Sequence, residues 1–298
     1  MFDYEQFFIH AGDAEKNLHI TREKPRKTTA LSPCDMDADD VDYEMQFPKN
    51  REMIRICGLT QAGFEHFCRR YGHTYRYIDL FKCQLISDLS PLGELPNLEY
   101  VHIFWNIRSD KLWDMSQNLH LKALHINDCK KMTYDPQLLA TAPALEDIGF
   151  SGIPFGSYPM KSLEVFSRIP TLKNLFLHRI KPEDKNVAFL DTAADLETFE
   201  FDPGMFTTEE IARMVARRPD VGGNFFRAYG QANPGSKTFM RVSGYRKPEL
   251  QLPRQQKALD KHVAYFNALV DQYRQEEILN EAHRNSDHSN AAAPSPRP

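Results

Sequence analysis

One apolar spacing recurs along the chain at nearly constant intervals, and this repetition constrains the fold more than any other feature. The spacing is L-x-x-L-x-L, with apolar residues at the first, fourth and sixth positions of a short segment. Five segments follow it fully: Leu98, Val101, Ile103; Leu121, Leu124, Ile126; Leu145, Ile148, Phe150; Leu172, Leu175, Leu177; and Leu196, Phe199, Phe201. Upstream, the pattern continues with Tyr75, Ile78 and Leu80, and then with Ile54 and Ile56, where Arg51 takes the first position.

These segments begin at positions 51, 75, 98, 121, 145, 172 and 196, at intervals of 24, 23, 23, 24, 27 and 24 residues. Between them lie stretches with helical spacing, at 60–72, 135–143, 161–170 and 207–219. The last opens with Thr207 and Glu210 in the spacing of a capping box. Each unit is therefore predicted to form a strand, a turn and a helix or helical turn. One such unit cannot bury its own apolar face, so stability must come from stacking.

A small polar residue follows the third apolar position by three residues in three consecutive units, as Cys83, Asn106 and Cys129. Such a side chain can bond backbone groups that a sharp turn leaves open. Together with the spacing, these residues resemble the leucine-rich-repeat family, and the stretch ISDLSPLGELPNLEYVHIFWN (86–106) looks much like an internalin-type unit. The resemblance covers about residues 51 to 206. It implies an α/β solenoid, a horseshoe with a parallel sheet on the concave side and helical or irregular segments on the convex side.

The ends of such an array need caps. We expect residues 1–50 to form the N-terminal cap, with a strand at NLHIT and a solvated acidic loop in DMDADDVDYEMQF. The repeats are assigned to 51–226, with the extra length in GIPFGSYPM as a surface loop and VGGNFF as a degenerate last strand. A C-terminal cap follows at 227–284, including a helix at 254–282, and 285–298 is expected to be a disordered tail.

Composition narrows the class of protein. Lys and Arg number 37 against 41 Asp and Glu, which argues against a nucleic-acid binder that neutralises phosphates. The five cysteines are scattered without a C-x-x-C pair, so neither a zinc knuckle nor a disulfide framework is indicated, and no cofactor is expected. The chain shows no signal peptide and no apolar run of membrane-spanning length, so a cytoplasmic protein without membrane contact is expected.

Strand geometry predicts the binding face. The apolar triplet points into the core, so the residues between and after its members point to the concave side and form rows across neighbouring strands. Large aromatic residues gather there, and such residues are typical of interaction sites. The predicted partner-binding residues are Tyr77, Asp79, Phe81, Tyr100, His102, Phe104, Trp105, His125, Phe176 and His178. A covering cap or loop, which would turn these rings into ordinary core, is the alternative.

The row Asp79, His102, His125 could also be interpreted as a metal site or an acid–base relay, since these are competent zinc ligands. A straight row approximates a tetrahedral shell poorly, and no fourth ligand is evident. The leading hypothesis is a non-enzymatic scaffold or inhibitor that binds a protein partner, in one version neutralising a toxin or an enzyme. The alternative is a substrate-recognition subunit of a larger complex such as a ligase, and a metal-dependent enzyme is the third.

Overall fold

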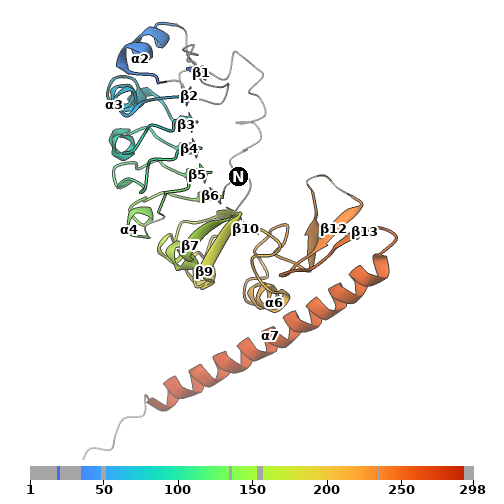
Figure 1. The fold of residues 1–298 in the computed structure, drawn as a ribbon. Coiled ribbons are helices and arrows are strands. Elements are labelled where there is room, and N and C mark those ends of the chain that lie inside the picture. Colours follow the sequence, from blue (N-terminus) through green and yellow to red (C-terminus); the bar gives the residue numbers. More distant parts are fainter. Residues whose placement is uncertain are drawn as a thin grey trace, which may run out of the picture. The chain divides into compact units, whose positions relative to one another are not determined.

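A parallel sheet organises the first part of the computed structural model, which describes residues 19–20, 35–47, 52–133, 136–152, 157–233, 235 and 237–291. Contacts divide the chain into two compact units, Met1–Glu197 and Thr198–Pro298. In the first unit, the sheet contains β1 (His19–Ile20), β2 (Met53–Cys57), β3 (Tyr77–Phe81), β4 (Tyr100–Phe104), β5 (Ala123–Asn127), β6 (Asp147–Ser151) and β8 (Asn174–His178). The strands lie side by side in this order (Figure 1). The predicted α/β class and parallel sheet are therefore present.

The register follows the apolar spacing. Ile78 pairs with Val101 and Leu80 with Ile103, and equivalent pairs continue across the sheet. These side chains are buried, with exposures of at most 1% from Ile54 to Leu177. The fourth and sixth positions of each segment thus form the core, as the spacing predicts.

Most connections between the strands contain a short helix: α2 (Ala38–Glu44), α3 (Gln61–Arg70), α4 (Pro136–Leu139) and α5 (Phe189–Thr192), with 3₁₀ helices η2 (Gly72–Thr74), η3 (Ser90–Glu94) and η4 (Leu163–Arg168). The connection between β4 and β5, residues 105–122, contains none, so the predicted helical turn is missing from that unit. The helices α2, α3 and α4 lie on one side of the sheet (Figure 1). The acidic segment expected to be a loop is instead the helix α2. Its Asp37 and Asp40 form a capping box, because carboxylates satisfy the open amides of a helix start.

The small polar residues of the repeat occupy the turns as predicted. The Asn106 side-chain amide donates to the carbonyls of Cys83 and Ile86, and its oxygen accepts from the amides of Arg108 and Ser109. The Cys83 thiol donates to the carbonyl of Ile56 at 3.3 Å. These bonds tie each turn to the preceding unit.

Charges alternate at the position just before each strand, a signal that the sequence reasoning did not use. Arg76 bonds Glu99 at 2.8 Å and Glu52 at 3.4 Å, and Lys173 bonds Glu146 at 3.1 Å. The full series in chain order is Glu52, Arg76, Glu99, Lys122, Glu146, Lys173 and Glu197. Because these ion pairs are partly exposed, each contributes at most about 1 kcal/mol to the free energy of unfolding. The alternating charges therefore favour one order of the strands more than they add stability.

One strand begins where a surface loop was expected, and its partner is a second strand that the sequence analysis did not predict. β7 (Tyr158–Ser162) falls at the end of GIPFGSYPM and pairs in parallel with β9 (Ile180–Asp184). The glycines and prolines of GIPFGSYPM had indicated a loop. Pro159 of β7 and Pro182 of β9 are both tolerated because only one side of each strand needs amide donors in a two-stranded sheet.

The second unit contains β10 (Thr198–Phe201), α6 (Thr208–Arg217), a meander of β11 (Tyr229–Gln231), β12 (Phe239–Val242) and β13 (Glu249–Gln251), and the long helix α7 (Gln256–Ala291). The meander lies in the predicted C-terminal cap, for which the sequence analysis predicts a helix but no strand. The capping box of Thr207 and Glu210 is confirmed. VGGNFF contributes a single bridge, from Thr198 to Gly222, in place of a strand.

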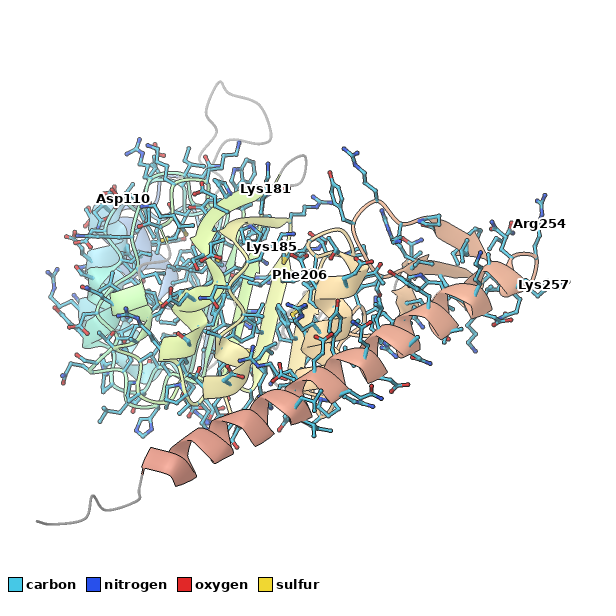
Figure 2. The ribbon with its side chains drawn as sticks, turned by 90° about the horizontal axis from the view of Figure 1, so that it is seen from below. Asp110, Lys181, Lys185, Phe206, Arg254 and Lys257 are labelled. Atoms are coloured by element: carbon cyan, nitrogen blue, oxygen red, sulfur yellow. The ribbon has the colours of Figure 1, made fainter. Side chains whose placement is uncertain are left out.

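The predicted C-terminal helix is confirmed and is longer than expected. It runs to Ala291, so the first part of the segment predicted as a tail is helical, and 292–298 lie outside the described residues. Arg254 lies just before α7 and Lys257 in its first turn (Figure 2). Leu259, Phe266 and Val270 are buried, and Tyr265 donates to Glu209 of α6 at 2.7 Å. This part of α7 is therefore core of the second unit.

Candidate functional site

The sheet register brings the predicted site residues into rows on the outer face of the sheet, the face that carries the residues between the core positions. Tyr77, Tyr100 and Ala123 are adjacent in one row, and Asp79, His102 and His125 in the next. Phe81, Phe104 and Asn127 form the third row, at the carboxyl ends of the strands. The predicted neighbour relations are confirmed.

The middle row is a buried chain of polar contacts. Asp79 accepts hydrogen bonds from the Arg55 Nε and from His102 Nδ1, the latter at 2.8 Å. On its other side, His102 Nε2 lies 3.2 Å from the amide of Asn127. With that amide donating, the proton of a neutral His102 ring lies on Nδ1 and faces the carboxylate. These contacts link four strands, and the two bonds that the Asp79 carboxylate accepts are charge-assisted.

His125, the next residue of this row, lies among aromatic rings. Its ring packs against Tyr100 and Phe176, with centroids 5.6 and 6.1 Å apart, and is 2% exposed. Gly149 makes room for it, since a Cβ there would lie 2.4 Å from His125 Nδ1. Burial lowers the pKa of His125 well below its usual value, so the ring is neutral at pH 7.

The interpretation of Asp79, His102 and His125 as a metal or catalytic group finds no geometric support. Asp79 and both ring nitrogens of His102 are engaged within the row, and His125 is held apart among rings. Among the residues that the structure describes, no three His, Cys, Asp or Glu side chains gather where they could hold a metal ion.

The expectation that the whole outer face is exposed is wrong for four of its residues. Tyr100 is 0% exposed, Asp79 0%, His102 1% and His125 2%. Tyr100 and Ala123 form a small buried cluster, against which Met53 and Tyr77 pack. Side chains within a row lie close enough to pack laterally, so a bulky row shields its own centre. These four side chains are therefore packed in the interior rather than presented to a partner.

The two aromatic residues of the third row remain accessible, and with the residue that follows each of them they form what we call the aromatic cluster: Phe81, Lys82, Phe104 and Trp105. All four are half-buried. The rings of Phe81 and Phe104 stack at 4.9 Å with planes 13° apart, and Trp105 meets Phe104 edge-on at 6.5 Å. The Lys82 Nζ lies 5.1 Å from the ring of Phe81 and 5.4 Å from that of Trp105. The guanidinium of Arg55 adds a second cation, 5.1 Å from Phe81.

The backbone positions this cluster through an uncommon conformation. Lys82 and Trp105 each follow a strand directly and have φ of 57° and 56°, and the same left-handed turn recurs at Asp128 and Arg179. Non-glycine residues adopt this region rarely, at a cost of about 1 kcal/mol. The amides of both residues still continue the sheet, donating to the carbonyls of Phe104 and Asn127. The turn sets Lys82 beside the rings, so the cluster is organised before any partner arrives.

The structure separates the remaining predicted residues from this cluster. Tyr77 is half-buried in the first row, and Phe176 and His178 lie on β8, half-buried and exposed respectively. Sequence reasoning missed Lys82 and Arg55 as members of the site. Their positions directly after and beside the aromatic residues could have indicated cation–π contacts.

The sequence matches no protein-family model, and no curated protein matches it. No described helix has both the length and the apolar composition that crossing a membrane requires.

Proposed function

We propose that the chain is a leucine-rich-repeat solenoid, a horseshoe without catalytic activity, that binds a protein partner through the aromatic cluster on its concave face. The ordered parallel strands, the interval of 23–27 residues and the turn bonds of Cys83 and Asn106 support the repeat architecture.

The aromatic cluster carries the binding proposal. Half-exposed rings offer large apolar area at a low entropy cost, and aromatic residues dominate the energetics of protein interfaces. Here the rings are already stacked and held by a fixed backbone turn, so ordering them on binding costs little free energy. Lys82 places a positive charge beside them, whereas the charge of Arg55 is paired with Asp79. A partner that inserts an apolar side chain beside a carboxylate fits this surface, and a toxin or an enzyme neutralised by the protein would be one such partner.

Site-specific photo-crosslinking tests the proposal. A photoreactive phenylalanine analogue is introduced at Trp105 and, as a matched control, at Tyr245, an exposed tyrosine of the second unit with Arg246 5.0 Å from its ring. We expect a protein partner that crosslinks from position 105 and not from position 245. Equal crosslinking of the partner from both positions would contradict the proposal. So would the absence of any crosslink from position 105 in a lysate in which the wild-type protein forms a complex.

The second candidate, a recognition subunit of a larger complex, is favoured by the end of α7. Ile278 and Leu279 are 65% and 59% exposed, beyond the part of the helix that packs on α6. Removing residues from 278 onward leaves that packed part in place. Loss of assembly with unchanged thermal stability would favour docking through this end, whereas unchanged assembly would exclude it.

A further inference from the structure

A second set of parallel contacts links successive units outside the main sheet, and it is interrupted at two points. The contacts are Met36 with Leu59, Thr60 with Leu85, Lys111 with Thr133, and the pair β7 and β9. Among the described residues, no such pair joins Leu85 to Lys111, and none joins Thr133 to β7. The second interruption falls in the unit whose interval is 27 residues.

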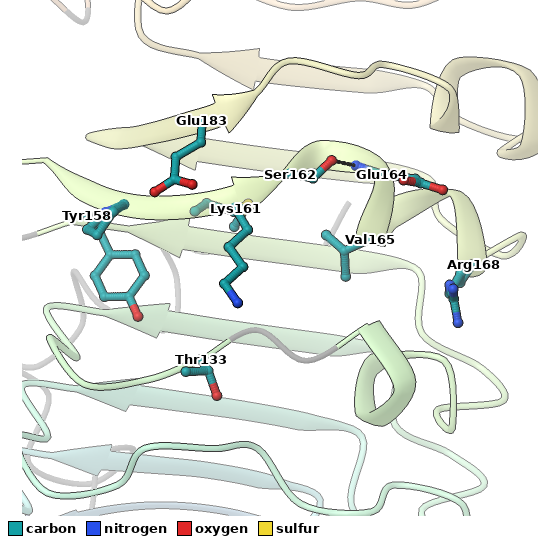
Figure 3. Close-up of a pocket in the computed structure, with 10 residues that line it drawn as sticks. Thr133, Tyr158, Lys161, Ser162, Glu164, Val165, Arg168 and Glu183 are labelled. Carbon is teal, nitrogen blue, oxygen red and sulfur yellow. Dashed lines mark hydrogen bonds between the residues drawn. The ribbon is translucent and has the colours of Figure 1, made fainter.

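A cavity of about 670 Å³ opens at this interruption. Thr133 lies on one side and β7 with η4 on the other (Figure 3). All five residues of β7 line the cavity. Because successive side chains of a strand point to opposite faces, a cavity that touches all of them follows the edge of the strand rather than one face.

The register with β9 shows which backbone groups meet this edge. Tyr158 pairs with Ile180, and its amide donates to the carbonyl of Arg179 at 2.7 Å. In a parallel pair, alternate residues direct both backbone groups to the same neighbour, so Tyr158, Met160 and Ser162 bond β9. Pro159 and Lys161 therefore direct their backbone groups to the cavity. The cavity thus meets two carbonyls but only one N–H, because proline lacks an amide proton.

The charged side chains around the cavity are unevenly placed. Lys161 and Arg168 are exposed and form no ion pair within the described part of the chain. In Figure 3 both extend toward the side on which Thr133 lies. Glu164 and Glu183 also line the cavity, but the carboxylate of Glu183 lies across β7 from the Lys161 ammonium (Figure 3). Val165 adds an apolar surface beside the cations.

We propose that this cavity is a second binding site, which takes an extended peptide with an acidic side chain by adding it as a strand to the open edge of β7. The peptide backbone would donate to the carbonyls of Pro159 and Lys161 and accept from the Lys161 amide. Its acidic side chain would face Lys161 and Arg168, and an apolar neighbour would lie against Val165. Strand addition of this kind takes affinity from the backbone and selectivity from alternate side chains. The site is independent of the aromatic cluster.

Fluorescence anisotropy with the full chain tests this proposal. The probe is a short, labelled, amidated peptide that alternates valine and glutamate. One comparison peptide has lysine in place of glutamate. Another is N-methylated at alternate residues, which removes backbone N–H donors and leaves the glutamate charges unchanged. We expect the glutamate peptide to bind, and both comparison peptides to bind at least about tenfold more weakly.

Two substitutions at one position separate charge from backbone. Lys161→Gln keeps the amide and should weaken binding about fivefold, whereas Lys161→Pro also removes the amide and should weaken it at least about tenfold further. The proline leaves the β7 to β9 bonds untouched, because the Lys161 backbone faces the cavity. Lys181→Gln on β9 is the matched control, because Lys181 (labelled in Figure 2) is exposed and does not line the cavity. This variant should bind as the wild type does.

Three results would overturn the proposal. The first is no binding of the glutamate peptide at millimolar concentration. The second is equal binding of the N-methylated peptide together with full competition by acetate, which would assign the site to a small anion. The third is equal affinity of Lys161→Pro and Lys161→Gln while both keep the circular dichroism of the wild type.

Discussion

Replacing Asn106 by alanine tests whether the turn asparagine holds neighbouring units together. Its side chain is 1% exposed and makes four bonds of 2.8–3.1 Å to backbone groups of two units. After the substitution, the carbonyl of Ile86 keeps the Ser109 hydroxyl as a donor, and the carbonyl of Cys83 keeps a long bond from the amide of Ile86. The amide of Ser109 loses its side-chain partner inside the protein.

At about 1 kcal/mol for each lost bond, and more for the buried amide of Ser109, the free energy of unfolding should fall by about 3–4 kcal/mol. The free energy of unfolding of Asn106→Cys should lie between those of the wild type and Asn106→Ala. A thiol can donate a hydrogen bond as Cys83 does, but it is only a weak acceptor. Asn97→Ala is the control, since the exposed Asn97 makes one bond of 2.7 Å, and it should cost less than about 1 kcal/mol. Urea denaturation followed by circular dichroism measures all three. A loss below about 1 kcal/mol for Asn106→Ala, equal to that of the control, would refute the reasoning.

Three further predictions concern the buried residues. Gly149→Ala should lower the free energy of unfolding by about 1–3 kcal/mol, because the added methyl group clashes with His125. In a His125→Ala background the same substitution should cost nothing, which a double-mutant cycle followed by urea denaturation measures. Burial lowers the pKa of His125, so the unfolded chain binds the proton more tightly than the folded chain does. The free energy of unfolding therefore has its full value above the unfolded pKa of about 6.5. Below that pH it falls by about 1.4 kcal/mol per pH unit. Urea titrations of wild type and His125→Gln between pH ~7.5 and ~5.5 should show the steeper loss in the wild type, and parallel curves would contradict this assignment. Burial raises the pKa of the Cys129 thiol to about 12, so iodoacetamide should leave it unmodified in the native protein and alkylate it in urea, as read by mass spectrometry.

The sequence was sufficient to predict the strands of the main sheet and their register, because each apolar triplet is a local signal repeated at a fixed interval. β4, for example, lies where Val101 and Ile103 place it. The strands β7 and β9 and the meander β11 to β13 carry no such pattern. They contain proline or are short, and they form because a neighbouring strand is present. The helix α2 was missed because its acidic residues suggested a loop, although Asp37 and Asp40 carry a capping signal.

The candidate site was predictable in its rows but not in its exposure. Alternation along a strand places Tyr100 and Phe104 on the same face, and the structure agrees. Burial depends on what surrounds each side chain, and so Tyr100 is enclosed while Phe104 stays half-exposed. The contribution of Lys82 depends on its left-handed backbone, which nothing in a lysine residue indicates.

The affinity of a Trp105→Gly variant for the partner found by crosslinking tests the central claim most directly. Glycine suits the left-handed backbone at this position, so the ring is lost without strain and the free energy of unfolding should not fall through the backbone. A ring at the centre of an interface contributes about 2 kcal/mol or more, so binding measured by calorimetry should weaken about thirtyfold or more. Tyr245→Ala should bind as the wild type does. Unchanged affinity of Trp105→Gly, with the same partner and stoichiometry, would contradict the proposal that the aromatic cluster is the binding site.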